Sequence, residues 1–148
     1  MIRNNSQYLS NSLTYVYQPE IGQRTKYTAF TSTVVISTAN SNLDGSGTLG
    51  TLIACTNTDG TLIKSITIKA LGSTTRGMIR FYTDGILSIR RILFEVEVPA
   101  VVISSVDESF SVQITTPIWL ENNKELYAST ENAESFAIIA EGLDISYP

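Results

Sequence analysis

Three pairs of carboxylates have the best spacing for chemistry in this sequence. They are Glu95 with Glu97, Asp107 with Glu108, and Glu131 with Glu134. A glycosidase needs two carboxylates, one as proton donor and one as base or nucleophile. Glu95 and Glu97 share a strand face with Arg91, however, and such a face is typical of a solvent-exposed side. Because nothing in the sequence defines a cleft between two carboxyl groups, the pairs are a weak indication of a hydrolase.

Catalytic and metal sites that depend on histidine or on several cysteines have no candidate residues. The 148-residue chain contains no histidine, and Cys55 is its only cysteine. Nucleophile–histidine pairs, four-ligand zinc sites and intrachain disulfides therefore have no candidates. Cys55 lies in the apolar run TLIACT, where a cysteine usually packs as a small hydrophobe. The sequence predicts a non-enzymatic protein with no catalytic residue, no cofactor and no metal ion.

Short strand-like runs of sequence are the elements that would position any binding residues. TLIKSITIKAL, GMIRFYT and IRRILFEVEV follow one another, separated by GSTTRG and TDG, and Asn57–Gly60 supplies a turn before them. The third run alternates most cleanly. One face carries Ile92, Phe94, Val96 and Val98, and the other carries Arg91, Leu93, Glu95 and Glu97. Pro99 is expected to end this run, because proline lacks the backbone donor that a sheet requires.

Similar runs elsewhere predict eight to ten strands. TVVIS begins at Thr33, a polar loop covers 39–50, and LGTLIACT, AVVISSV and ESFSVQITT follow. SFAIIAEG and LDISY are predicted to form a terminal pair around Gly142, and Pro117 to mark a strand edge or bend. In TLIKSITIKA, Leu62 is expected to share a side with Ile66, Ile68 and Ala70, and Ile63 to take the other side. ENNKELYASTENAES is the best helical alternative.

These runs predict an all-β fold, a single-domain β-sandwich of jelly-roll type. The sandwich is expected over residues 34–148, after a polar N-terminal arm or lead-in over residues 1–33. Within that segment, Tyr8, Tyr15 and Tyr17 are candidate contacts. The segment would either cover the sandwich or lie on a neighbouring subunit through its aromatic anchors.

Trp119 and Tyr127 are further contact candidates, because aromatic rings stack on sugars. A core position is the alternative for both residues. For Trp119 that alternative is favoured by its apolar neighbours Ile118 and Leu120.

Charged residues are distributed unevenly along the chain. Residues 1–100 carry a net +3 and residues 101–148 a net −7. The acidic last third disfavours a nucleic-acid partner; it would face either solvent or a basic neighbouring subunit. The sequence shows no apolar stretch of signal-peptide length and no run of about 18 apolar residues. We therefore expect neither classical export nor a membrane partner.

Several blocks resemble one family when taken in order. They are the turn Asn57–Gly60, the runs Ile66–Lys69, Arg80–Gly85 and Leu93–Pro99, and the segment Leu126–Gly142. In that order they are similar to small virion structural proteins of tailed bacteriophages, and the overall character of the sequence favours crAss-like phages. The resemblance covers about 60% of the chain and leaves residues 1–50 unmatched.

The resemblance implies a β-sandwich subunit present in many copies on the capsid surface of a virion and made in the host cytoplasm. It implies a capsid auxiliary or decoration protein whose partners are the major capsid protein or other virion proteins. A tail or head-fibre module that binds a host glycan or receptor is the alternative. No catalytic residues come with this resemblance.

Overall fold

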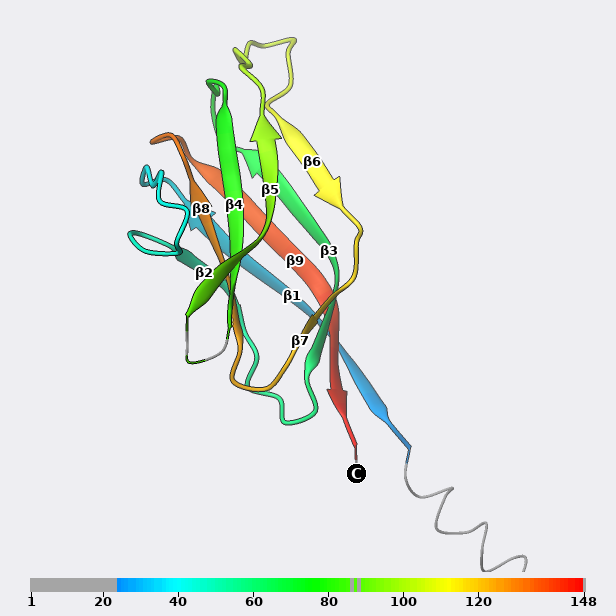
Figure 1. Ribbon diagram of the computed structural model, residues 1–148. Coiled ribbons are helices and arrows are strands. Elements are labelled where there is room, and N and C mark those ends of the chain that lie inside the picture. The colour runs from blue at the N-terminus through cyan, green and yellow to red at the C-terminus, as the bar shows by residue number, and fades with distance from the viewer. Residues whose placement is uncertain (1–23, 86, 88, 148) are drawn as a thin grey trace, which may run out of the picture.

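Nine β-strands build the part of the chain that the computed structural model describes, residues 24–85, 87 and 89–147 (Figure 1). They are β1 (Lys26–Ile36), β2 (Gly50–Ala54), β3 (Thr61–Ala70), β4 (Gly77–Asp84), β5 (Arg90–Val98), β6 (Ser111–Ile114), β7 (Ile118–Leu120), β8 (Glu125–Thr130) and β9 (Phe136–Ser146). The all-β prediction is confirmed, and the helical alternative is wrong because its residues form β8.

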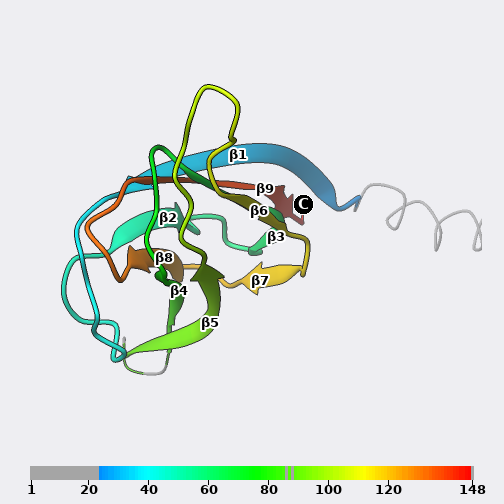
Figure 2. The ribbon, with the colours of Figure 1, turned by 90° about the horizontal axis from the view of Figure 1, so that it is seen from above.

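The strands form two antiparallel sheets that pack face to face, seen from above in Figure 2. Sheet A has the order β1-β9-β3-β6, and β7 also pairs with β3. Sheet B has the order β2-β8-β4-β5. At one side of the sandwich the edge strands β1 and β2 meet, because the Ser32 hydroxyl donates to the Leu52 carbonyl at 2.6 Å. This side is closed.

The core lies between the sheets and is made by the inward-facing residues of the strands. Its largest fully buried apolar side chains are Leu52, Ile63, Ile66, Ile68, Ile79, Phe81, Leu126, Phe136 and Ile138. The Phe81 ring stacks on the Phe94 ring with centroids 4.5 Å apart. In β5 the predicted alternation is confirmed: Ile92, Phe94, Val96 and Val98 are the more buried set. Pro99 follows the last residue of that strand, as predicted.

A β-bulge corrects the prediction for β3. Pairing with β9 shifts register between Ile63 and Ser65, so Ile63 points into the core with Ile66. Leu62 instead lies on the outer face. An extra residue in one strand reverses the alternation beyond it, and the sequence pattern alone gave no sign of that residue.

Gly142 lies within β9 rather than at a turn, so the predicted terminal pair of strands is wrong. β9 runs unbroken from Phe136 to Ser146 and pairs with β1 along its length. A Cβ at Gly142 would lie 2.0 Å from the Leu62 carbonyl oxygen and 2.9 Å from the Phe30 ring. Glycine is used here for close approach of a neighbouring strand.

Two further boundaries differ from prediction. β1 begins at Lys26, not at Thr33, because it pairs with β9 from its first residue. The AVVISSV run is not a strand. Apart from an isolated bridge between Thr74 and Val101, it belongs to a projecting loop between β5 and β6 (Figure 1), in which Val102 is 79% exposed.

A loop covers the outer face of sheet B, which sequence alternation alone would place in solvent. The Tyr82 hydroxyl donates to the Asn42 carbonyl at 2.7 Å, and Arg90 donates to the Gly45 carbonyl at 3.2 Å. The Arg90 guanidinium also lies 4.4 Å from the centre of the Tyr127 ring. Both tyrosines are consequently buried.

Burial of Tyr127 predicts a loss of stability at alkaline pH. Burial, and next the hydrogen bond to Glu125, raise the pKa of Tyr127 to about 12 from the usual 10. Above pH 10 the unfolded chain releases this proton while the folded chain keeps it, so the free energy of unfolding falls as pH rises towards 12. Urea titrations on both sides of pH 10 should therefore show a smaller pH-dependent loss for Tyr127→Phe than for the wild type.

Tyr27→Phe is the matched control for this measurement, since Tyr27 is 60% exposed. This control should lose stability with pH as steeply as the wild type. An equal slope for Tyr127→Phe and the wild type would contradict the assignment.

Candidate functional site

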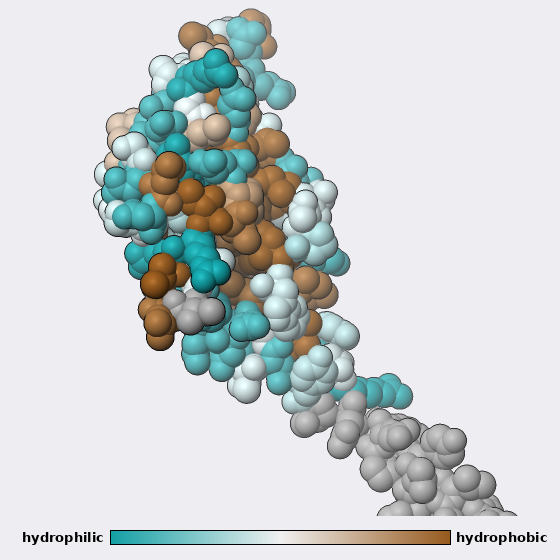
Figure 3. Space-filling view, viewed as in Figure 1, coloured by the Kyte–Doolittle hydropathy of each residue, from teal (hydrophilic) through white to brown (hydrophobic). Residues whose placement is uncertain are grey.

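The side of the sandwich opposite β1 and β2 is open. There the edge strand β5 of sheet B faces β6 and β7 of sheet A, and the inward-facing Phe94, Ile114 and Ile118 are only half-buried. A groove of about 560 Å³ lies between the two edges. Apolar side chains gather on this side of the molecule (Figure 3). The volume falls in the range of pockets that accept a ligand or several side chains.

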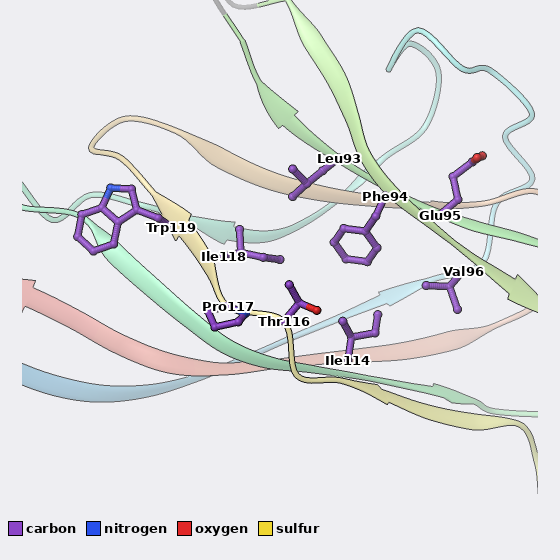
Figure 4. Close-up of a pocket in the computed structure, with 9 residues that line it drawn as sticks. All are labelled: Leu93, Phe94, Glu95, Val96, Ile114, Thr116, Pro117, Ile118 and Trp119. Atoms are coloured by element: carbon purple, nitrogen blue, oxygen red, sulfur yellow. The ribbon is translucent and has the colours of Figure 1, made fainter.

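The Phe94 ring occupies the middle of the groove. Ile118 from β7 points towards it, Leu93 from β5 lines the rim, and Trp119 lies at one end (Figure 4). Val96 and Ile114 continue the apolar surface at the other end. The groove is thus an apolar surface with few polar groups, suited to holding apolar or aromatic side chains rather than to transferring protons.

The local sequence explains why this side stays open. β6 has four residues and β7 has three, and Pro117 stands directly before β7. Proline cannot donate to a sheet ladder, so the edge of sheet A is interrupted here. The prediction that Pro117 marks a strand edge or bend is confirmed.

Trp119 lies at the surface, so the core interpretation of this residue is wrong. Its side chain is 50% exposed, and its ring packs over Gly60 at the Asn57–Gly60 turn. That turn was predicted; Gly60 has a φ of +96°, which suits glycine. The apolar neighbours Ile118 and Leu120 point inward, and alternation therefore directs Trp119 outward.

The other candidate contacts do not join Trp119. Tyr127 is 6% exposed and belongs to β8 of the opposite sheet, beneath Arg90, so its ring is not free to stack on a ligand. This corrects its assignment as a contact residue. Tyr8, Tyr15 and Tyr17 lie outside the described residues.

Three glutamates of the carboxylate pairs contact arginines on the outside of sheet B. Glu95 accepts from Arg80 at 2.8 Å, and Glu97 accepts from Arg76 at 2.9 Å. Glu131 lies 3.7 Å from Arg80. Opposite charges facing each other across strands stabilise a sheet, and this role accounts for the two glutamates of β5.

Glu134 binds the Thr75 hydroxyl at 2.6 Å and its backbone N–H at 2.7 Å. Asp107 accepts from the Ser104 hydroxyl at 2.6 Å in the exposed loop before β6. Across the described ranges, no three acidic, cysteine or histidine side chains gather closely enough to hold a metal ion. The same residues contain no helix with the length and apolar character needed to cross a membrane.

The groove residues Phe94, Ile114 and Ile118 were missed as functional candidates. In the sequence they read as ordinary inward-facing strand residues. Only the sheet order shows that their strands are edges, and strand order is a property of the whole fold. The short, proline-interrupted run around Pro117 was the one available signal.

The sheet order and the packed inner faces define a single-domain β-sandwich of the jelly-roll class. Its fold is similar to that of a solved structure described as an Eiger TNF from S. frugiperda, with a TM-score of 0.50 over 78% of this chain and 91% of that one. The two sequences are 12% identical, so the likeness concerns the fold alone. No model of a protein family matches the chain, and no curated protein matches it either.

Proposed function

We propose that the protein is a non-enzymatic structural subunit of a tailed bacteriophage, a capsid auxiliary or decoration protein that binds the outer shell in many copies. The observation that carries the proposal is the open apolar groove between β5 and β6–β7. An exposed apolar surface of this kind marks a site where another protein binds. Its partner would be the major capsid protein or another virion protein.

The placement of the family-like blocks supports the same proposal. The runs that resemble phage virion proteins form the turn before β3, the middle of β3, most of β4 and β5, and the length of β8 and β9 up to Gly142. They therefore lie in five of the strands that form the two sheets, and β5 among them provides one wall of the groove.

Mass spectrometry of purified particles tests this function. We expect the chain in the virions of the phage that encodes it, in a fixed ratio to the major capsid protein. Washing the particles at high salt should release little of it, because an apolar contact is strengthened rather than screened by salt. Absence of the chain from purified particles, or only a few copies per particle, would defeat the proposal.

A fibre module that binds a host glycan is the second candidate, and the exposed Trp119 ring favours it. Half of this side chain faces solvent beside the groove. Glycan-array binding that disappears in Trp119→Ala, with the circular dichroism spectrum unchanged, would favour this function over decoration.

A further inference from the structure

Both walls of the apolar groove are free strand edges. Within the described residues, β5 pairs only with β4, and β6 and β7 pair only with β3. Each wall therefore carries backbone N–H and C=O groups that no neighbouring strand of the sandwich uses. A free edge beside an apolar floor is the arrangement that accepts an added extended segment, with backbone hydrogen bonds for affinity and alternate side chains for specificity.

The sequence before β1 contains a segment with the pattern that such a groove requires. Leu13, Tyr15 and Tyr17 are two residues apart, and Tyr8 precedes them. In an extended strand, residues two apart point to the same face and are separated by about 6.6 Å. Three consecutive anchors of this kind would span roughly 13 Å.

We propose that residues 8–17 of one copy bind in the groove of a neighbouring copy, adding a strand beside β5. The inference rests on the proposed function and deepens it: the virion protein that fills the groove would be a neighbouring copy of this chain, and contact with the shell would use other surfaces. Leu13, Tyr15 and Tyr17 would face Phe94 and its apolar neighbours in the groove. The backbone of the segment would use the free edge of β5.

The sheet order places the arm and the groove at opposite edges of each copy, which suits a contact between neighbouring copies. β1 is one edge strand of sheet A, and β6 and β7 form the opposite edge. Seen from above, β5 and β7 lie on the side away from β1 (Figure 2). When copies stand side by side in one orientation, the segment that precedes β1 of one copy faces the groove of the next. Such head-to-tail contacts close into rings when the rotation between copies closes, and form open filaments when it does not.

The chain has the length for this contact. Ala29 of β1 is level with Trp119 of β7, because they are linked in register through Leu143 and Leu62. Three strand spacings, about 14 Å, separate these two residues within one copy. Residues 18–25, between the last tyrosine anchor and β1, can extend to roughly 28 Å, a length that serves a groove in a neighbouring copy and also the arm's own groove. The mixing experiment below distinguishes the two.

Trp119 provides the readout. It is the only tryptophan of the chain, and it lies half-exposed at one end of the groove. A segment that covers the groove removes water from this ring and shifts its emission to shorter wavelength. Dilution that separates the copies would reverse the shift.

The experiment uses the full chain in four variants besides the wild type. The arm variant carries Leu13→Ser, Tyr15→Ser and Tyr17→Ser, which removes the three anchors that share one face. The groove variants are Leu93→Glu and Thr116→Lys, both at exposed positions that line the groove. Val102→Glu is the control, since Val102 is exposed and lies in the loop before β6. Sedimentation velocity measures association, and circular dichroism checks that each variant is folded.

We expect the wild type and Val102→Glu to associate, with the dilution-dependent shift of Trp119 emission. The arm variant should associate at least about tenfold more weakly because it removes the anchors of the contact, and both groove variants should do so because each puts a charge into the apolar groove. Mixing the arm variant with a groove variant should give pairs that stop at one copy of each, since only one arm and one matching groove remain intact.

Three results would overturn the inference. These are association of the arm variant at wild-type strength, a mixture that forms no pairs, or a monomeric wild type whose Trp119 emission is independent of concentration. The last result would place the arm in its own groove. None of them depends on the particle, and the absence of the chain from virions would leave self-association unaffected, so the two proposals fail separately.

Discussion

Gly142→Ala is expected to lower the free energy of unfolding by at least about 3 kcal/mol, at or beyond the upper end of ordinary overpacking. The added methyl would lie 2.0 Å from the Leu62 carbonyl oxygen, and this atom belongs to the backbone of a paired strand. A flexible side chain could turn away, but a carbonyl in a ladder cannot move without breaking the pairing of β3 with β9. Urea denaturation followed by circular dichroism measures the change.

Gly72→Ala is the matched control, because a methyl at Gly72 would have no atom within 4 Å. Its stability should remain within about 0.5 kcal/mol of the wild type. If the two alanine variants prove equally stable, β9 does not pass Leu62 as closely as described, and the register of sheet A is in error.

Phe81→Ala should remove about 3–5 kcal/mol of stability, the usual effect of deleting a buried phenylalanine ring. The Phe81 ring is fully buried, and it stacks on Phe94 at the floor of the groove. For a chain of this size we expect the thermal midpoint to fall by roughly 10 °C. Differential scanning calorimetry measures both the midpoint and the enthalpy.

Two comparisons sharpen the Phe81 prediction. Val102→Ala, in the exposed loop before β6, should leave the midpoint unchanged. Phe94→Ala should be less destabilising than Phe81→Ala, because Phe94 is already half-exposed to the groove. If Phe94→Ala were the more destabilising, the groove would be closed in solution.

The sequence predicted the fold class because the alternation of β5 and the turn at Gly60 are local properties. It misplaced Leu62 and Ile63 because a one-residue bulge leaves no mark in the pattern of residue types. It misread Gly142 because glycine serves turns and close strand contacts equally well. Each error arose where a neighbouring strand, rather than the segment itself, determines the outcome.

The candidate site was less predictable than the fold. Trp119 was named as a candidate contact, and its apolar neighbours suggested burial. Those neighbours point inward, and strand alternation therefore directs Trp119 to the surface. The groove around Phe94 depends on which strands remain at the edges of the sheets. That order is fixed by long-range pairing, and a single sequence does not display it.

Labelling of the single cysteine can measure how often the fold opens locally. Cys55 is 3% exposed, and its Sγ lies 3.3 Å from the Thr61 hydroxyl. A thiol reagent can reach it only when the segment between β2 and β3 opens, so the labelling rate under native conditions reports how often that opening occurs. With no second thiol in the chain to react, every modified molecule records one such event.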